Sequence, residues 1–574
     1  MDNSVHQQIA HTDTYAQCAK KHIPEFSVQS KNQTLKMQPI FDLNANQENL
    51  KLPTPVQAHH LEHYLQGYNP FLSHYLVQGF KFGFSLGCSA YPKPRLCRNH
   101  SSTTQHADYV LDKIQNEVDL GRIAGPYPSP PFQTFVCSPL GVVPKSTPGK
   151  YRLIHDLSFP SADSVNSYIS EEHSKIKYDT IDTIISLVLK FGKGSLMAKS
   201  DIEDAFRIIP LHPDSYHALG LTWAGQYYFD KCLPMGASSS CKIFESFSTA
   251  LQWIMMSKYK VQGMSHMIDD FFIIGPDNSS KCLHDLENFL ILCSTLGVPI
   301  KKDKTVLPCK VITIYGLEID SEAMECRLPS DKLDKLRTML ENFSHRKKVT
   351  VKELQSVLGS LSFASSVICP GRAFLRRLFD LLCGPQKPSY YKIRLNKEAR
   401  ADLHAWSIFI NNFNGKCIIS NSQHISSDSL RMYTDASGVI GFAGVFGANW
   451  FAGRWPAKCM DYHITEKELF PIVLALEIWG STLKNKNVLF LTDNEAVSYI
   501  INHQSSKDQT IMRLVRRLVL TCLQFNIRFE SEHLPGKQNI IADGLSRFQF
   551  QKVFQRAPWL ERTPTPVPPE LMTI

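Results

Sequence analysis

The sequence lacks several features that would assign it to common classes of protein. It has no run approaching 18 uninterrupted apolar residues, so no membrane-spanning helix is predicted. Residues 1–30 are polar and have no apolar core, so no secretory signal peptide is predicted. The 15 Cys are scattered and form no Cys-x-x-Cys pair. This pattern predicts reduced thiols in an intracellular protein, in the cytoplasm, the nucleus or both.

A structural zinc site is also disfavoured. Cys97 and His100 are spaced like half of such a site, but no second half follows at zinc spacing. The 574 residues suffice for three or four domains, and 43% hydrophobic and 20% charged residues are typical of a globular protein. The net charge of +9 is compatible with a polyanionic partner and equally with a mildly basic globular protein.

Positive charge is absent around one pair of acids. Asp269 and Asp270 lie between apolar residues, with no Lys or Arg within four positions on either side. Adjacent acids repel each other, and burial of either is costly unless a cation offsets it. The pair fits either a solvated hairpin tip or part of a metal site. Carboxylates elsewhere in the chain must decide between the two.

Two earlier segments supply suitable charges. Residues 137–156 predict a β-hairpin, because two apolar runs flank a Thr-Pro-Gly-Lys turn. This hairpin carries Lys145 and Arg152, and arginine can bind phosphate oxygens through two nitrogens. An ordinary solvated hairpin is the alternative. Residues 195–209 predict a strand that ends at Asp201, where the fixed backbone suits an acid to hold a cation.

The segment Leu-Pro-Met235-Gly236 precedes small residues and a helix predicted at 242–258. Small residues at a helix start allow close approach of a flat ligand, and the free amides favour phosphate. Asp269 and Asp270 then lie at the turn of a predicted hairpin. Apolar periodicity predicts a strand at 311–319 and helices at 101–125, 181–191, 280–296, 331–343, 351–366, 372–382 and 396–413.

The order of these elements resembles the reverse transcriptase domain of retroelements, over residues 135–320. Five motifs occur in sequence: the basic hairpin, the strand with Asp201, the Leu-Pro-x-Gly helix, the Asp269-Asp270 hairpin and a Gly-x-Pro-x-Lys-Lys segment. The resemblance implies that Asp201 and Asp269, with Asp270 beside them, serve a polymerase site. Met267 stands where such enzymes usually have Tyr, which predicts altered fidelity or rate.

The same resemblance implies the nucleotide contacts. Lys145 and Arg152 would grip the triphosphate. Phe206 would lie under the sugar, clash with a 2′-OH and so select dNTPs. Met235 and Gly236 would lie beside the nucleotide or the template, with Met235 where Gln or Phe is commoner.

Four further acids follow in the last third of the chain. Asp435 and Asp493 each end a predicted strand, Glu468 lies in the first turns of a predicted helix, and Asp543 opens the last helix. This part resembles the RNase H domain of retroelements over residues 428–550. The resemblance implies that the four acids bind metal and that His533 is the mobile catalytic histidine.

Both resemblances imply the same chemistry. Phosphodiester transfer needs the attacking and leaving oxygens stabilised together, which two Mg²⁺ about 3.5–4 Å apart achieve. Carboxylates are hard oxygen ligands that select Mg²⁺, with Mn²⁺ as the alternative. Two such ions are expected at each site.

The predicted fold class is α/β (α+β): a right-hand polymerase of fingers, palm and thumb, followed by an RNase H-like mixed-sheet domain. The predicted divisions are a disordered tail (1–55), a helical extension (56–134), fingers and palm (135–320), thumb and connection (321–427), RNase H (428–550) and a Pro-rich tail (551–574), the last expected to be an extended linker from Phe548.

These features predict an RNA-directed DNA polymerase with RNase H activity. Its expected partners are an RNA template, a DNA primer, an RNA/DNA hybrid and dNTPs, with no membrane. The Leu-Ser-Arg-Phe and Thr-Pro-Thr-Pro segments, without a retropepsin-like or integrase-like motif, resemble DIRS- or Ngaro-like retrotransposons, which implies a tyrosine recombinase from the same element. A decayed or domesticated copy that only binds nucleic acid, and a non-LTR-type polymerase, are the alternatives.

Overall fold

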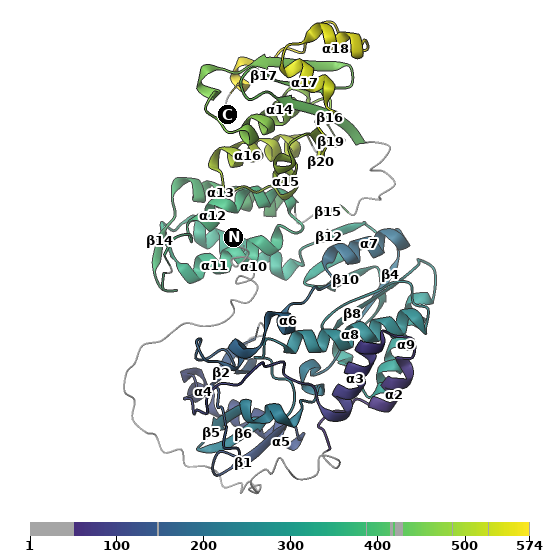
Figure 1. The fold of residues 1–574 in the computed structure, drawn as a ribbon, viewed down its shortest axis with the longest axis vertical. Helices are drawn as coiled ribbons and strands as arrows, with labels where there is room; N and C mark the ends of the chain where they lie inside the picture. Colours follow the sequence, from purple (N-terminus) through teal and green to yellow (C-terminus); the bar gives the residue numbers. More distant parts are fainter. Residues whose placement is uncertain are drawn as a thin grey trace. The chain divides into compact units, whose positions relative to one another are not determined.

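The computed structural model describes residues 51–145, 149–385, 387–413, 417–418, 429–484, 486–525 and 527–572. The chain divides near residues 315–324 into two compact units (Figure 1). The described part of the first unit is residues 51–315 with 320–323, and that of the second is 316–319 with 324–572. Residues 1–50 of the predicted tail lie outside the described residues.

The first unit is built on three sheets. Its strands are β1 (Ile123–Tyr127), β2 (Leu140–Pro144), β3 (Tyr151–His155), β4 (Leu196–Asp201), β5 (Gly220–Trp223), β6 (Gln226–Asp230), β7 (Met264–Met267), β8 (Asp270–Gly275), β9 (Val306–Cys309) and β10 (Val311–Ile314). Strands β1 to β9 form the sheets β7-β8-β4-β9 and β1-β6-β5 and the hairpin β2-β3, whereas β10 pairs with β11. The helices are α2 (Ala58–Tyr64), α3 (Pro70–Phe82), α4 (Ser101–Gln105), α5 (Ala107–Asp119), α6 (Glu171–Ser174), α7 (Ile181–Phe191), α8 (Ser240–Ser257) and α9 (Lys281–Leu296).

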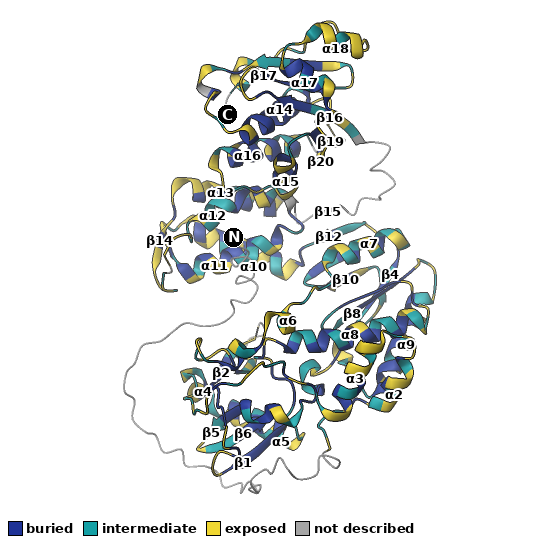
Figure 2. Cartoon of the chain, viewed as in Figure 1, coloured by how far each residue is buried: buried dark blue, intermediate teal, exposed yellow. Residues whose placement is uncertain are grey.

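The apolar run of β8 is explained by burial on both faces of the strand. Phe271 and Ile273 pack into the main core, and the alternating Phe272 and Ile274 are equally buried. Figure 2 shows buried residues along the strands of this sheet. Helices α8 and α9 contact this sheet on β7, β8 and β4. The sheet is thus a rigid support whose strand ends carry the acids.

The second unit begins with helices and ends with a mixed sheet. Its first elements are β11 (Leu317–Asp320), β12 (Glu325–Arg327), α10 (Ser330–Ser344), β13 (Lys348–Thr350), α11 (Val351–Ala364), α12 (Arg376–Asp380), β14 (Lys392–Arg394), α13 (Lys397–Phe413) and β15 (Cys417–Ile418). Helix α11 starts at a capping box, in which Thr350 and Glu353 satisfy each other's backbone amides.

The mixed sheet has the order β18-β17-β16-β19-β20. Its elements are β16 (Ser429–Ala436), β17 (Gly441–Phe446), β18 (Asn449–Arg454), α14 (Ile464–Trp479), β19 (Asn487–Thr492), α15 (Glu495–His503), α16 (Gln509–Gln524), β20 (Arg528–His533), α17 (Ile540–Ser546) and α18 (Phe550–Arg556). Strands β16, β19 and β20 run parallel, whereas β17 and β18 are antiparallel additions. The predicted mixed α/β class is confirmed.

Several predicted elements are wrong. The strand predicted at 311–319 is interrupted at Tyr315 and Gly316, both with positive φ, so β10 and β11 are separate. The helix predicted at 101–125 ends at Asp119 and gives way to β1. The helix predicted at 372–382 is a 3₁₀ turn followed by the short α12.

Both predicted ends of the chain also need correction. The tail predicted as an extended linker contains α18, and Val553 and Leu560 are buried against β17 and β18. The Nε1 of Trp450 donates to the carbonyl oxygen of Glu561 at 2.8 Å, which anchors this tail. Residues 51–55 are not a free tail either, because the Thr54 hydroxyl donates to the carbonyl oxygen of Ile208 at 2.6 Å.

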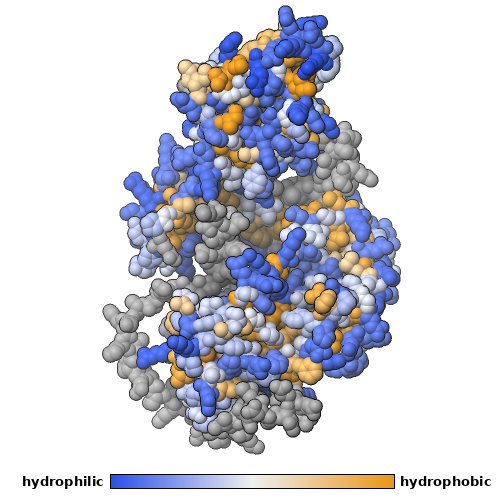
Figure 3. All heavy atoms as spheres, viewed as in Figure 1, coloured by the Kyte–Doolittle hydropathy of each residue, from blue (hydrophilic) through white to orange (hydrophobic). Residues whose placement is uncertain are grey.

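Figure 3 shows hydrophilic residues over most of the visible face, with hydrophobic residues in small groups between them. Within the described ranges, none of the helices is both long and apolar enough to cross a membrane.

Candidate active sites

The first group of acids meets at one end of the β7-β8-β4-β9 sheet. Asp201, the last residue of β4, is the direct partner of Asp270, the first residue of β8. Ile268 and Asp269 form the connection from β7 to β8. The antiparallel register therefore brings Asp201 beside the Asp269-Asp270 pair, as the sequence predicts.

The turn that carries Asp269 is held from behind by α8. Ile268 has φ of 56°, a left-handed conformation that is unusual for a β-branched residue. Its backbone N–H donates to Glu245 Oε2 at 2.9 Å, and its carbonyl oxygen accepts from the Ser248 hydroxyl at 2.6 Å. Helix α8 thus satisfies both backbone groups of the strained residue and fixes the turn.

The three acids perturb one another. Burial raises the pKa of Asp269, and the charge of Asp201 raises it further. Burial, followed by the charges of Asp269 and Asp201, raises the pKa of Asp270 to about 6. The ammonium of Lys304 donates to Asp201 Oδ2 at 2.7 Å and offsets part of this negative charge. The three acids can carry more negative charge than one lysine balances, and a divalent cation would balance the remainder.

The predicted phosphate contacts lie on or next to the β2-β3 hairpin and interact electrostatically with nearby charged groups. The positive charge of Arg152 lowers the pKa of Asp269, although burial dominates and the net shift is upward. Partial burial lowers the pKa of Lys145, and the charges of Arg152 and Lys301 lower it further. Mutual repulsion among three cations, next to the acids, suits the group to a polyanion.

The surroundings of the remaining predicted nucleotide residues are also defined. Phe206 lies in the 3₁₀ turn Ala205–Ile208 and packs edge-to-face on Phe244, with ring centroids 5.7 Å apart. Met235 is 54% exposed. A Cβ on Gly236 would lie 1.9 Å from the carbonyl oxygen of His155, so only glycine fits there.

The second group of acids is set by parallel register. Tyr433 of β16 pairs with Leu491 of β19, so Asp435 and Asp493, each two residues further on, end at the same edge of the sheet. Glu468 reaches this edge from α14, which contacts β16. Carboxylate oxygens of Asp435, Glu468 and Asp493 all lie within 4.8 Å of one another. The sequence prediction that these strands and this helix converge is thereby supported.

Burial and crowding raise the pKa of each carboxyl. Burial first, and the neighbouring acids next, raise the pKa of Glu468 to about 9. Burial raises the pKa of Asp435 to about 6, although the Ser546 hydroxyl, a hydrogen-bond donor to its Oδ2, lowers it. Burial also raises the pKa of Asp493. Glu468 Oε2 is buried and has no hydrogen-bond partner among the described residues, so the cluster fits a divalent cation.

Asp543 and His533 lie at the margin of this cluster. Asp543 is not among the three acids within 4.8 Å, but its charge raises the pKa of all three. Its Oδ1 accepts from Arg547 Nε at 2.6 Å. His533 is exposed at the end of β20, with Nε2 3.2 Å from the backbone oxygen of Asp493. The structure thus brings three of the predicted acids together and holds the fourth beside them.

Several contributing residues were not predicted from the sequence. Ser546 and Arg547 follow Asp543 by three and four positions, and this helical spacing is a signal that could have identified them. Lys304 lies just past the Lys301-Lys302 pair of a recognised motif, so proximity in sequence hints at it. Glu245 has no comparable local signal, because its contact with Ile268 spans 23 residues.

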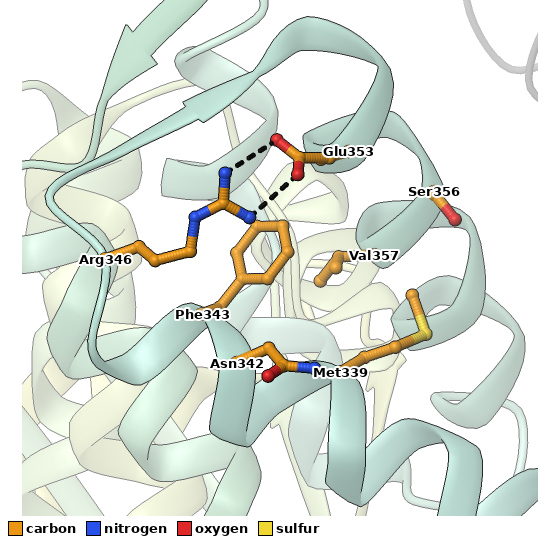
Figure 4. Close-up of a pocket in the computed structure, with 7 residues that line it drawn as sticks. All are labelled: Met339, Asn342, Phe343, Arg346, Glu353, Ser356 and Val357. Atoms are coloured by element: carbon orange, nitrogen blue, oxygen red, sulfur yellow. Dashed lines mark hydrogen bonds and ion pairs between the residues drawn. The ribbon is translucent and has the colours of Figure 1, made fainter.

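A further hollow of about 380 Å³ lies between α10 and α11 (Figure 4). Phe343 and Val357 line it, and Arg346 donates to both carboxylate oxygens of Glu353 at 2.8 and 3.1 Å. The guanidinium and the Thr350 backbone lower the pKa of Glu353 to about 2. The charges of Arg346 and Glu353 in this hollow are thus paired with each other.

Comparison with known proteins agrees with the second site. Residues 426–520 match the family model described as "RNase H-like domain found in reverse transcriptase". The C-terminal part of the chain is therefore RNase H-like, as the sequence predicts. Asp435, Glu468 and Asp493 lie within the matched range, whereas His533 and Asp543 lie beyond it.

More than half of the chain is similar to viral polyproteins. It is 25% identical over 382 residues to the putative enzymatic polyprotein of Cassava vein mosaic virus, covering 63% of this chain and 54% of that protein. It is 25% identical over 358 residues to Protein P of Heron hepatitis B virus, covering 60% of this chain and 40% of that protein. The chain thus spans about half the length, or less, of these curated relatives.

Among solved structures, a foamy viral protease-reverse transcriptase in complex with RNA/DNA hybrid is 16% identical, with a TM-score of 0.47 and coverage of 84% of this chain and 64% of that one. The same enzyme in complex with dsDNA is 18% identical, with a TM-score of 0.46 and coverage of 84% and 98%.

Proposed function

We propose that this chain is the RNA-directed DNA polymerase and RNase H of a retrotransposon, which copies RNA into DNA and degrades the RNA strand of the hybrid. The observation that carries the proposal is the presence of two separate acid groups, each at a strand end that the sheet holds rigid. The RNase H-like match and the similarity to reverse transcriptase/RNase H polyproteins support it.

At the first site, Asp201, Asp269 and Asp270 would hold two divalent cations, Mg²⁺ or Mn²⁺. Such ions stabilise the attacking and leaving oxygens of phosphoryl transfer. Lys145 and Arg152 orient the triphosphate of a dNTP through charge and hydrogen bonds. Phe206 excludes a 2′-OH by contact with the sugar. Met235 and Gly236 border the nucleotide, where the absence of a Cβ on Gly236 lets the chain pass close to His155.

At the second site, Asp435, Glu468 and Asp493 would hold the cations, with Asp543 completing the set. His533 is exposed beside Asp493 and is placed to move a proton near the scissile phosphate. Ser546 orients Asp435 by donating a hydrogen bond to its carboxylate. The substrate of this site is the RNA strand of an RNA/DNA hybrid.

Primer extension tests the polymerase. Wild-type chain with an RNA template, a DNA primer, dNTPs and Mg²⁺ is expected to extend the primer, and Asp269→Asn to lose at least a hundredfold in rate. Asp112→Asn, which changes an exposed acid on α5, is the control and should match wild type. Equal incorporation by Asp269→Asn and wild type would refute the assignment.

Sugar selection tests Phe206 separately. Phe206→Ala is expected to raise the efficiency of rNTP relative to dNTP incorporation by tenfold or more, because the ring would no longer meet the 2′-OH. An unchanged ratio, measured with matched rNTP and dNTP pairs, would remove this role from Phe206.

Cleavage of a labelled RNA/DNA hybrid tests the RNase H activity. Wild type in Mg²⁺ is expected to cut the RNA strand, and Asp493→Asn to be inactive. The exposed acid Asp461, changed to Asn, is the control. Hybrid that is bound yet remains uncut by wild type would favour the second candidate function, a domesticated copy that only binds nucleic acid.

The proposal extends to lineage and partners. The Leu-Ser-Arg-Phe and Thr-Pro-Thr-Pro segments support a DIRS- or Ngaro-like element, in which a tyrosine recombinase is encoded alongside. Sequencing the genomic region downstream of this chain tests it. A recombinase frame there would support the assignment, and a retropepsin or integrase frame would contradict it.

A further inference from the structure

Arg207 is a buried guanidinium that immediately follows Phe206. Its side chain is only 12% exposed, yet it makes two ion pairs. Its Nε donates to Glu117 Oε2 at 2.9 Å, and its Nη2 lies 2.7 Å from Asp230 Oδ1. Both carboxylates are themselves buried. One arginine therefore joins α5, the 3₁₀ turn with Phe206 and the end of β6.

The ion pair between Arg207 and Asp230 is connected to the basic hairpin through His155. Asp230 Oδ2 lies 3.1 Å from His155 Nδ1, and His155 Nε2 lies 3.1 Å from the carbonyl oxygen of Gly220. Burial raises the pKa of Asp230, but Arg207 and His155 outweigh burial and the net pKa falls below its ordinary value. His155 ends β3, the strand that carries Arg152. The ionic network therefore reaches the strand of a predicted triphosphate contact.

The network also reaches the segment before Met235. Arg207 Nη1 lies within hydrogen-bond distance of the carbonyl oxygens of Cys232 and Leu233, at 3.5 and 3.4 Å. On the other side, the carbonyl oxygen of His155 is the atom that a Cβ on Gly236 would meet. The backbone on both sides of Met235 is thus in contact with a member of the network.

Three of the five predicted nucleotide contacts therefore share one buried support. Phe206 is covalently next to Arg207, Arg152 lies three residues before His155, and Gly236 packs against the His155 backbone. A buried ion pair is not required for stability, because well-packed apolar residues often serve as well or better. Its fixed, directional hydrogen bonds instead suit it to set the relative position of elements that are far apart in sequence.

We propose that Glu117, Arg207, Asp230 and His155 form a positioning network that aligns the sugar, triphosphate and base contacts of the nucleotide pocket. The inference rests on the polymerase function proposed above. Arg207 is its centre, since its planar guanidinium forms hydrogen bonds with Glu117 and two carbonyl oxygens and an ion pair with Asp230 at once. Lysine keeps the charge but cannot make this set of contacts.

Steady-state primer extension with Arg207→Lys tests the network. The KM for dNTP is expected to rise at least tenfold and the preference for dNTP over rNTP to fall at least tenfold, with kcat within about threefold of wild type. Arg95→Lys is the matched control: Arg95 lies in the same unit, is 16% exposed, and bonds Asp163 and the carbonyl oxygen of Phe159. Arg95→Lys should leave the KM for dNTP and the preference for dNTP over rNTP unchanged.

Two further measurements keep the outcomes separate. If Arg207→Lys fails to fold, as judged by circular dichroism, Glu117→Gln removes one charge of the network and is expected to change KM and discrimination in the same direction. If wild type extends no primer, the polymerase function and this inference both fail. If wild type extends primers and Arg207→Lys or its substitute behaves like Arg95→Lys, the positioning network alone is overturned.

Discussion

Glu468 lies in the second carboxylate cluster, and its neutralisation has an effect on stability that can be worked out from its surroundings. Burial and the charges of Asp435 and Asp493 raise the pKa of Glu468 from 4.5 to about 9. Each unit of pKa difference between the folded and unfolded states corresponds to about 1.4 kcal/mol. Glutamine has nearly the same shape and carries no charge, so Glu468→Gln removes this contribution while leaving the packing in place.

The sign follows from which state holds the proton. The unfolded chain loses the Glu468 proton near pH 4.5, whereas the folded chain retains it to about pH 9. The contribution of Glu468 to the free energy of unfolding is therefore fully retained below pH 4.5. It falls by about 1.4 kcal/mol per pH unit up to about pH 9 and levels off above that pH. In the absence of metal, Glu468→Gln is expected to be about 3 kcal/mol more stable than wild type at pH 7.

Divalent metal is expected to reduce or reverse the stability advantage of Glu468→Gln over wild type. A cation that binds only the folded state stabilises it, by about 2.7 kcal/mol at one hundred times its dissociation constant. Wild type is expected to gain this stabilisation in Mg²⁺, and Glu468→Gln to lose most of it because one carboxylate ligand is missing. The variant should therefore unfold at a higher temperature than wild type in EDTA, with the difference shrinking or reversing in Mg²⁺.

Thermal unfolding followed by calorimetry at pH 5, 7 and 8.5, with EDTA or Mg²⁺, measures this. A gain of about 3 kcal/mol raises the midpoint by roughly 6 °C or more in a unit of this size. Glu477→Gln is the matched control on the same helix, because both oxygens of Glu477 accept from Arg517 at 3.0 and 2.7 Å. It should lower the midpoint in either buffer. Destabilisation by Glu468→Gln in EDTA at pH 7, or an equal gain at pH 5 and 8.5, would refute the electrostatic reasoning.

Two other substitutions have clear expectations. Gly236→Ala places a Cβ 1.9 Å from the carbonyl oxygen of His155, so it should destabilise the first unit by about 3 kcal/mol in denaturant unfolding. Gly359→Ala is the control, because its Cβ would enter open space and the substitution should not destabilise the second unit. Ser546→Ala removes the hydrogen bond to Asp435 and should slow hybrid cleavage about tenfold with little change in KM; a rate within twofold of wild type would contradict this.

The positions of the acids could be predicted because each follows from local structure. Asp201 ends β4, Asp435 is the penultimate residue of β16 and Asp493 directly follows β19, and strand ends are fixed in space by the sheet. Their exact partners could not be predicted, because register is a property of the pair of strands. The sequence does not say that Asp270, rather than Asp269, lies opposite Asp201.

Long-range polar contacts were beyond the sequence. Arg207 looks like an exposed residue of a short turn, and its bond to Glu117 spans 90 residues. The C-terminal tail is a different case. Val553, Ala557 and Leu560 follow a helical spacing that indicates a buried stripe, whereas the linker prediction rests only on the prolines beyond them.

The two acid groups differ in how their negative charge is balanced. At the first, Lys304 donates directly to Asp201, so a cation that binds this carboxylate must displace or share that contact. At the second, no ion pair joins a lysine or arginine to Asp435, Glu468 or Asp493 within the described ranges, and the nearest such contact is Arg547 on Asp543. The repulsion between the crowded carboxylates is therefore partly offset by Lys304 at the first site. At the second site it must be relieved by protonation or by a bound metal ion. The second site is accordingly the one whose charge state responds more strongly to metal, and the first is the one whose lysine can hold the acids in place without it.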